Sequence, residues 1–152
     1  MRKKALFICI AFVCLLALLC AGCNSQTGAN EVVAEAFGNG TFESRENDNG
    51  TVGLFVASEE KPIIDVVDSI SKTEEKIYMR GHRGEQYRFY GLIDLTANTM
   101  QICVSASDIG NISDPAELFP TNLVDNGVVA VCRFSDFSET DRAILNELSQ
   151  PE

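Results

Sequence analysis

Basic and aromatic side chains alternate along two segments in the middle of the chain, a pattern suited to binding an anionic ligand. Strand-like alternation places five of them on one face: Lys76, Tyr78, Arg80, Arg88 and Tyr90. Ammonium and guanidinium groups donate charge-assisted hydrogen bonds to acidic groups, and aromatic rings stack on flat or cationic partners. We predict that this face binds an anionic glycan, a phosphate-bearing polymer or an acidic protein. The alternative is a solvated sheet face on which arginine stems cover the tyrosine rings.

Acid–base catalysis has one candidate imidazole, His82, because the chain contains a single histidine. His82 lies in the segment 81–85, whose two glycines predict a hairpin loop. A hydrolase triad also needs a nucleophile, and the chain has no Gly-x-Ser-x-Gly motif. We therefore predict no catalytic residue and no enzyme activity. The alternative is an enzyme that acts on cell-envelope material through His82 or dispersed carboxylates.

Cys103 and Cys132 form either a disulfide or two separate buried thiols. A cysteine pair in an oxidising compartment commonly forms a disulfide. Alternation argues against the bridge, because Cys103 shares a face with Gln101 and Ser105 whereas Cys132 shares one with apolar residues. A single histidine and two unclustered cysteines make no zinc site, so we predict no metal and no cofactor.

The first 23 residues have the order of features found in export signals. Three basic residues at positions 2–4 precede an uncharged apolar run from Ala5 to Leu19, which is short for a membrane-spanning helix. An Ala-Gly pair then stands directly before Cys23. This ending resembles the lipobox of bacterial lipoprotein precursors, in which the cysteine takes a diacylglyceryl group and the chain is cut before it. Cys20 departs from that family, which usually has leucine at this position.

The resemblance implies lipidation of Cys23 and attachment to the cell membrane on its extracytoplasmic side. Two acyl chains make a stable anchor, whereas one chain holds only marginally. The chain then divides into a signal peptide (1–22), a lipidated flexible tether (23–30) and a single β-rich domain (31–152). An ordinary secretory peptide and an uncleaved membrane helix remain as alternatives.

Removal of the signal peptide leaves 130 residues with a strongly acidic balance. The signal holds three of the 12 Lys and Arg and none of the 22 Asp and Glu, so nine basic and 22 acidic residues remain, a formal charge of −13. This charge disfavours nucleic acid and anionic membrane surfaces as broad electrostatic partners. Five of the nine basic residues fall between Lys72 and Arg88, which makes that segment a local exception.

Period-two hydrophobicity dominates the domain and predicts half-buried strands. The expected strands cover six segments: 51–57, 63–69, 76–80, 86–94, 99–106 and 128–134. Asn-Gly pairs at 39–40 and 49–50 predict hairpin turns. Pro62 leaves a helix as the alternative for the segment 63–69. The segment 128–134 is apolar on both faces, which predicts a central strand.

Two helices are expected in the C-terminal part of the chain. Asp114 caps a short helix that Pro120 ends, and Ser138 begins another with Leu145 and Leu148 on its buried side. The predicted fold class is therefore α+β: an antiparallel meander, curved or sandwich-like, with a short loop helix and a C-terminal helix packed on it.

The anchor, the acidic domain and the local basic face together predict a membrane-tethered lipoprotein with a non-catalytic binding or accessory role at the cell envelope. Two other functions remain as alternatives. One is the enzyme described above, and the other is a structural or immunity-type surface protein.

Overall fold

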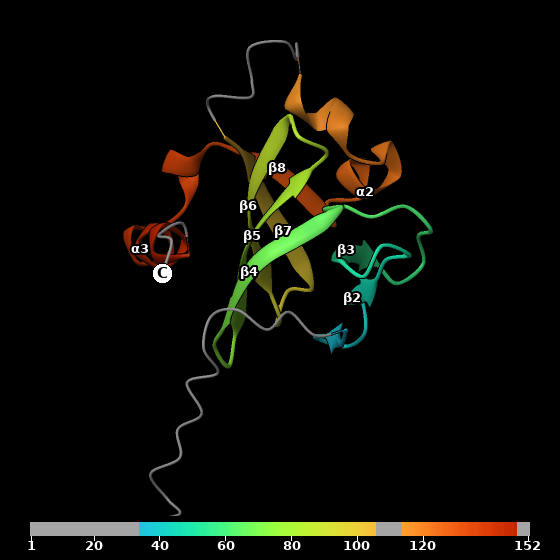
Figure 1. Cartoon of the computed structure of the whole chain (residues 1–152). Coiled ribbons are helices and arrows are strands. Elements are labelled where there is room, and N and C mark those ends of the chain that lie inside the picture. The colour runs from blue at the N-terminus through green and yellow to red at the C-terminus, as the bar shows by residue number, and fades with distance from the viewer. Residues whose placement is uncertain (1–33, 106–113, 149–152) are drawn as a thin grey trace, which may run out of the picture.

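The computed structural model describes residues 34–105 and 114–148, and Figure 1 draws the whole chain. Cys23, the predicted signal peptide (1–22) and the predicted tether (23–30) lie outside the described residues. Within the described ranges, no helix combines the length and apolar character needed to cross a membrane.

A small antiparallel sheet opens the fold. Its order is β1 (Ala36–Phe37), β2 (Phe42–Glu46) and β3 (Val52–Val56). Both Asn-Gly pairs lie in the connecting turns, where Gly40 and Gly50 adopt positive φ angles of 87° and 77°. Glycine tolerates this backbone conformation without the clash that a Cβ atom causes. The two predicted hairpins are therefore confirmed.

A larger sheet of five strands forms the centre of the fold. Its strands, in spatial order, are β4 (Val66–Lys72), β5 (Lys76–Arg83), β6 (Tyr87–Asp94), β7 (Thr99–Val104) and β8 (Val129–Cys132). The first four strands make an antiparallel meander, as predicted, and β8 runs parallel to β7. Segment 63–69 contributes a strand, not a helix, although Ile64 pairs with Leu54 of β3 before β4 begins.

The prediction of a central strand at 128–134 was wrong, because β8 is an edge strand. Its apolar character on both faces has another cause. Val129 is fully buried in the core on one face, where α2 (Thr121–Asp125) packs. Cys132 packs on the opposite face against a second apolar cluster that includes Phe137. An edge strand whose two faces are both buried has apolar residues on both faces, which is also the pattern of a strand in the middle of a sheet.

The described residues hold four helical segments after β7: η2 (Pro115–Leu118), α2 (Thr121–Asp125), η3 (Phe134–Asp136) and α3 (Glu139–Glu147). The Asp114 carboxylate caps η2 by accepting from the Ala116 amide at 2.9 Å. The predicted short helix is thus a 3-10 turn, and α2, which was not predicted, begins directly after Pro120. Ser138 caps α3, as predicted.

Both faces of the five-stranded sheet are covered, and Figure 1 shows α3 on one side and β2, β3 and α2 on the other. The larger core lies between the two sheets and includes Met79, Phe89 and Ile102. The smaller core lies under α3 and contains Tyr78, Leu92, Cys103, Phe137 and Leu145. A nine-residue helix is about 14 Å long, whereas an eight-residue strand spans roughly 26 Å. Therefore α3 covers only about half of this face.

Candidate functional site

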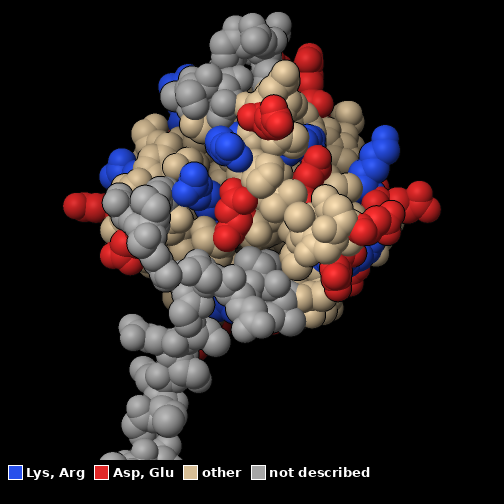
Figure 2. Space-filling view, viewed as in Figure 1, with Lys and Arg blue, Asp and Glu red and all other residues tan. Residues whose placement is uncertain are grey.

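The predicted basic and aromatic side chains lie on the sheet face toward α3. Strand register places Arg80 of β5 directly opposite Tyr90 of β6, and His82 opposite Arg88. In Figure 2, Lys and Arg side chains gather over the upper half of the five-stranded sheet, with Asp and Glu side chains beside them. Basic side chains therefore reach the surface here, but acidic side chains lie among them.

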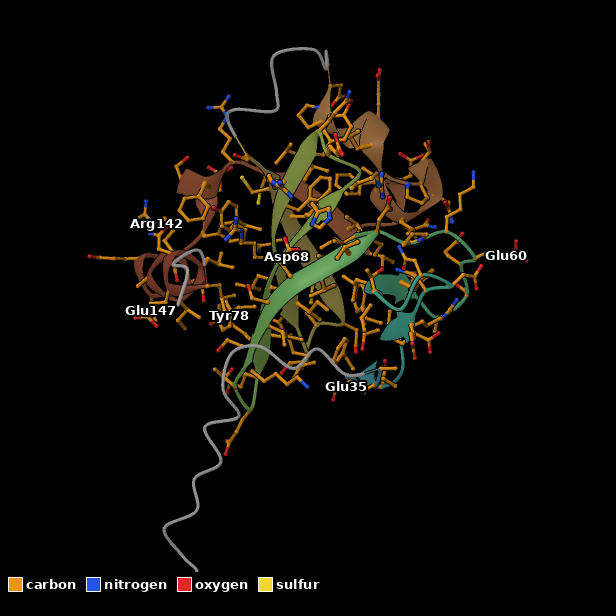
Figure 3. All side chains as sticks on the ribbon, viewed as in Figure 1. Glu35, Glu60, Asp68, Tyr78, Arg142 and Glu147 are labelled. Carbon is orange, nitrogen blue, oxygen red and sulfur yellow. The ribbon has the colours of Figure 1, made fainter. Side chains whose placement is uncertain are left out.

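The lower half of this face is not available to a ligand, because α3 lies on it. Tyr78 is only 3% exposed, and Figure 3 shows it on the side of the sheet that faces α3. Its hydroxyl donates to the Asp141 carboxylate of α3 at 2.8 Å, and the Lys76 ammonium donates to the same carboxylate at 3.0 Å. The predicted contact face of five residues thus narrows to Arg80, Arg88 and Tyr90.

A pocket of about 630 Å³ lies beside the remaining part of the face. We call it the Tyr90 pocket. Its apolar lining comes from β6, β7, β8, η2 and η3: Tyr90, Cys103, Val104, Pro115, Cys132 and Phe134. Three polar residues complete its lining: Ser105, Arg133 and Asn146. Ser105 follows β7, and its amide donates to the carbonyl of Arg88 at 2.9 Å, which joins the pocket to the basic face.

Two aromatic rings form one wall of the Tyr90 pocket. The rings of Tyr90 and Phe134 meet edge to face with centroids 5.1 Å apart, and Phe134 meets Phe137 in the same way at 5.9 Å. The turn η3 holds Phe134 in place, because the Arg133 amide donates to the Asp136 carboxylate at 2.8 Å. Edge-to-face aromatic pairs are favourable contacts beyond the area they bury. The wall is therefore preformed.

Cys103 and Cys132 lie side by side at the Tyr90 pocket. They are register partners on the parallel strands β7 and β8, both line the pocket, and both thiols are free in the structure. The register places both cysteines on one face of the sheet, so the alternation within each strand does not argue against a bridge. Alternation shows which residues share a face within one strand, but the relation between the faces of two strands depends on their register.

Burial raises the pKa of the Cys132 thiol to about 12, and the neighbouring Cys103 and Asp136 add to the effect. Burial also raises the pKa of Cys103, against a hydrogen bond from the backbone of Phe134. The thiolate is the nucleophilic form of cysteine. Neither thiol is therefore activated as a catalytic nucleophile at neutral pH.

His82 lines a second, polar pocket of about 440 Å³ together with Asn47 and Thr51 of the β2–β3 connection. Its Nδ1 atom lies 2.9 Å from a carboxylate oxygen of Asp68 on β4, the edge strand where Figure 3 labels Asp68. A carboxylate orients an imidazole in hydrolase triads. However, the Thr51 hydroxyl, which lines the same pocket, donates to Asn49 at 2.6 Å and not to His82. Among the described residues that line this pocket, none presents a nucleophile to His82.

The sequence did not indicate three residues of the pocket lining: Arg133, Phe134 and Asn146. Arg133 directly precedes η3, Phe134 lies in η3, and Asn146 lies in α3, so only the fold brings them to the pocket. The one available signal was the apolar character of 128–134 on both faces.

Across residues 34–105 and 114–148, no group of three or more His, Cys, Asp or Glu side chains is placed to hold a metal ion.

Comparisons with known proteins add no relative: no family model, curated protein or solved structure matches the chain.

Proposed function

We propose that the protein is a lipid-anchored, extracytoplasmic binding protein that holds an anionic glycan in the Tyr90 pocket. The pocket carries this proposal, because ligand sites are commonly concave, mostly apolar and edged by a few polar groups. Its volume of about 630 Å³ falls within the range of such sites. The anchor is supported by the N-terminal sequence, in which two small residues directly precede Cys23.

The composition of the Tyr90 pocket supports a ligand with a ring-shaped body and an acidic group. The rings of Tyr90 and Phe134 meet at an angle and offer an apolar corner to the carbon face of a sugar. The Arg133 guanidinium can donate paired hydrogen bonds to a carboxylate or phosphate. Arg80 and Arg88 on the adjoining face carry further guanidinium groups that a longer acidic ligand could reach. A neutral sugar makes no use of these charges.

We expect Arg133→Gln to weaken the binding of uronic-acid or phosphate-bearing oligosaccharides about tenfold, because one charge-assisted hydrogen bond is lost. Surface plasmon resonance with the full chain in detergent measures the affinity. Arg142→Gln is the matched control, since Arg142 lies on α3 and does not line the pocket. Equal affinities of Arg133→Gln and the unmodified protein would show that the Tyr90 pocket is not the glycan site. Binding to an acidic protein, with no binding to any oligosaccharide, would show that the ligand is not a glycan.

We expect protein isolated from its native membrane to begin at Cys23 and to carry two or three acyl chains on that residue. Intact-mass spectrometry combined with fragmentation of the N-terminal peptide measures both features. The carbonate-washed membrane fraction should retain the protein, because two chains anchor stably. Protein that begins at Met1, or washed-off protein with an unmodified Cys23 thiol, contradicts the lipid anchor. Neither result bears on ligand binding in the Tyr90 pocket.

A further inference from the structure

The contact between β7 and β8 places two cysteines next to each other in the lining of the Tyr90 pocket. Cys103 and Cys132 are Cα register partners on neighbouring parallel strands. The Cys132 thiol points back across the strand pair, since its Sγ donates to the carbonyl of Ile102 on β7 at 3.6 Å. The pair therefore shares one face, one pocket and one strand junction.

We propose that Cys103 and Cys132 form a reversible disulfide that joins β8 to β7 in the oxidised protein. The proposal goes beyond ligand binding and does not depend on it. Neighbouring strands lie about 4.8 Å apart, which falls inside the Cα separation of about 4.4 to 6.8 Å that disulfides usually span. As an edge strand, β8 has a strand neighbour on one side only and can move toward β7.

The oxidant is an exogenous disulfide, either a protein disulfide or glutathione disulfide. The Cys132 thiolate attacks one of its sulfurs, forms a mixed disulfide and releases one thiol. The Cys103 thiolate then attacks the Cys132 sulfur, closes the internal bond and releases the second thiol. Two electrons and two protons thus pass from the protein to the two released thiols. Attack begins at Cys132 because it is partly exposed, whereas Cys103 is only 4% exposed. The raised pKa of Cys132 makes this attack slow in the folded protein.

The bond has consequences for both the edge strand and the pocket. In the reduced protein, β8 is held to the sheet through β7 alone and is its shortest strand, with four residues. A covalent link between residues 103 and 132 closes a loop that contains η2 and α2, which restricts the unfolded chain. Because both cysteines line the Tyr90 pocket, the redox state also changes the pocket lining.

Peptide mapping tests the bond directly. Trypsin cuts after Lys and Arg, so residues 89–133 form a single peptide that carries both cysteines and none of the other four. We expect this peptide to resist alkylation after the full chain has been refolded in a buffer of glutathione disulfide, and to take two alkyl groups after reduction. Refolding gives the oxidant access to both thiols. Two alkylated cysteines, or glutathione adducts, in the refolded sample overturn the proposal.

A variant with a displaced thiol is the matched control. In Ala130→Cys/Cys132→Ala the thiol stays on the same face of β8 but moves about 6.6 Å along the strand. We expect this peptide to remain fully alkylatable in the oxidising buffer. We also expect oxidation to raise the melting temperature of the unmodified protein by roughly 5 to 10 °C and to leave that of Cys132→Ser unchanged. An equal rise in both proteins contradicts the bond.

Discussion

Replacing Arg83 with methionine is expected to lower the free energy of unfolding by about 3 kcal/mol, because three carbonyl groups lose their hydrogen-bond donor. The Arg83 guanidinium donates to the carbonyls of Pro62 at 3.0 Å and Ile63 at 2.6 Å, and also to the carbonyl of Leu118. It lies over the rings of Phe89 and Phe119, with its central carbon 5.9 Å and 5.6 Å from their centroids. One side chain therefore joins the β5–β6 hairpin to two other segments.

Urea unfolding at neutral pH measures this effect, and two further variants separate its causes. Arg83→Lys keeps the charge, but an ammonium group cannot reproduce the planar fork of donors, so we expect about half of the loss. Arg142→Met removes an arginine from the surface of α3 and should change stability by less than about 0.5 kcal/mol. If Arg83→Met unfolds at the same urea concentration as the unmodified protein, water has replaced the guanidinium at all three carbonyls.

Arg83 illustrates what local sequence could not show. Its flanking glycines predicted a loop, whereas β5 extends through Arg83 and the side chain points into the domain. The carbonyls that it contacts lie 20, 21 and 35 residues away in the sequence. Contacts with main-chain carbonyls leave no residue pattern, because every residue carries such a group.

The strands of the meander, in contrast, follow from alternation alone. Segments 76–80, 86–94 and 99–106 were predicted as strands, and β5, β6 and β7 occupy them. Each strand has one face in the large core and one face toward α3, so its apolar residues recur with a period of two. The starts of η2 and α3 were equally predictable, since Asp114 and Ser138 accept hydrogen bonds from the first turns.

The candidate site was predicted less well because its parts meet only in the folded chain. Alternation placed Tyr78 and Tyr90 on one face, but only the docking of α3 decides that Tyr78 is buried and Tyr90 lines a pocket. Asp141, which accepts the hydrogen bond from the Tyr78 hydroxyl, lies 63 positions away in the sequence. The crossover between β7 and β8 likewise determines that Cys103 meets Cys132.

Asp141→Asn is expected to lower the free energy of unfolding by about 2 to 3 kcal/mol, because a buried carboxylate with three side-chain partners loses its charge. Asp141 is 7% exposed and accepts from Ser138 at 2.6 Å, Tyr78 at 2.8 Å and Lys76 at 3.0 Å. These bonds join the first turn of α3 to β5. Asp125→Asn is the control, because Asp125 is an exposed carboxylate in α2, and we expect it to change stability little.

The acid dependence of stability identifies the carboxylate itself. Burial raises the pKa of Asp141, but the hydrogen bonds from Ser138, Tyr78 and Lys76 and the charge of Lys76 outweigh it and hold the pKa below 3.8. A lowered pKa means that the folded state favours the charged form. Asp141 thus stabilises the fold above its unfolded pKa and loses this contribution as the pH falls through the folded value. The gap between the unmodified protein and Asp141→Asn should narrow on acidification.

Tyr78 provides the complementary alkaline test of the same contact. Burial, the hydrogen bond to Asp141 and the negative charge of that residue together raise the pKa of Tyr78 to about 12 from its ordinary value of 10.0. The folded state therefore favours the protonated phenol, and its contribution is complete below pH 10 and lost as the pH rises toward 12. Tyr78→Phe should remove this alkaline loss and weaken the acid limb only in part, because Ser138 and Lys76 still favour the charged form of Asp141. Unfolding curves across both limits measure the two effects separately. An acid limb that survives in Asp141→Asn would mean that other carboxylates hold α3 on the sheet.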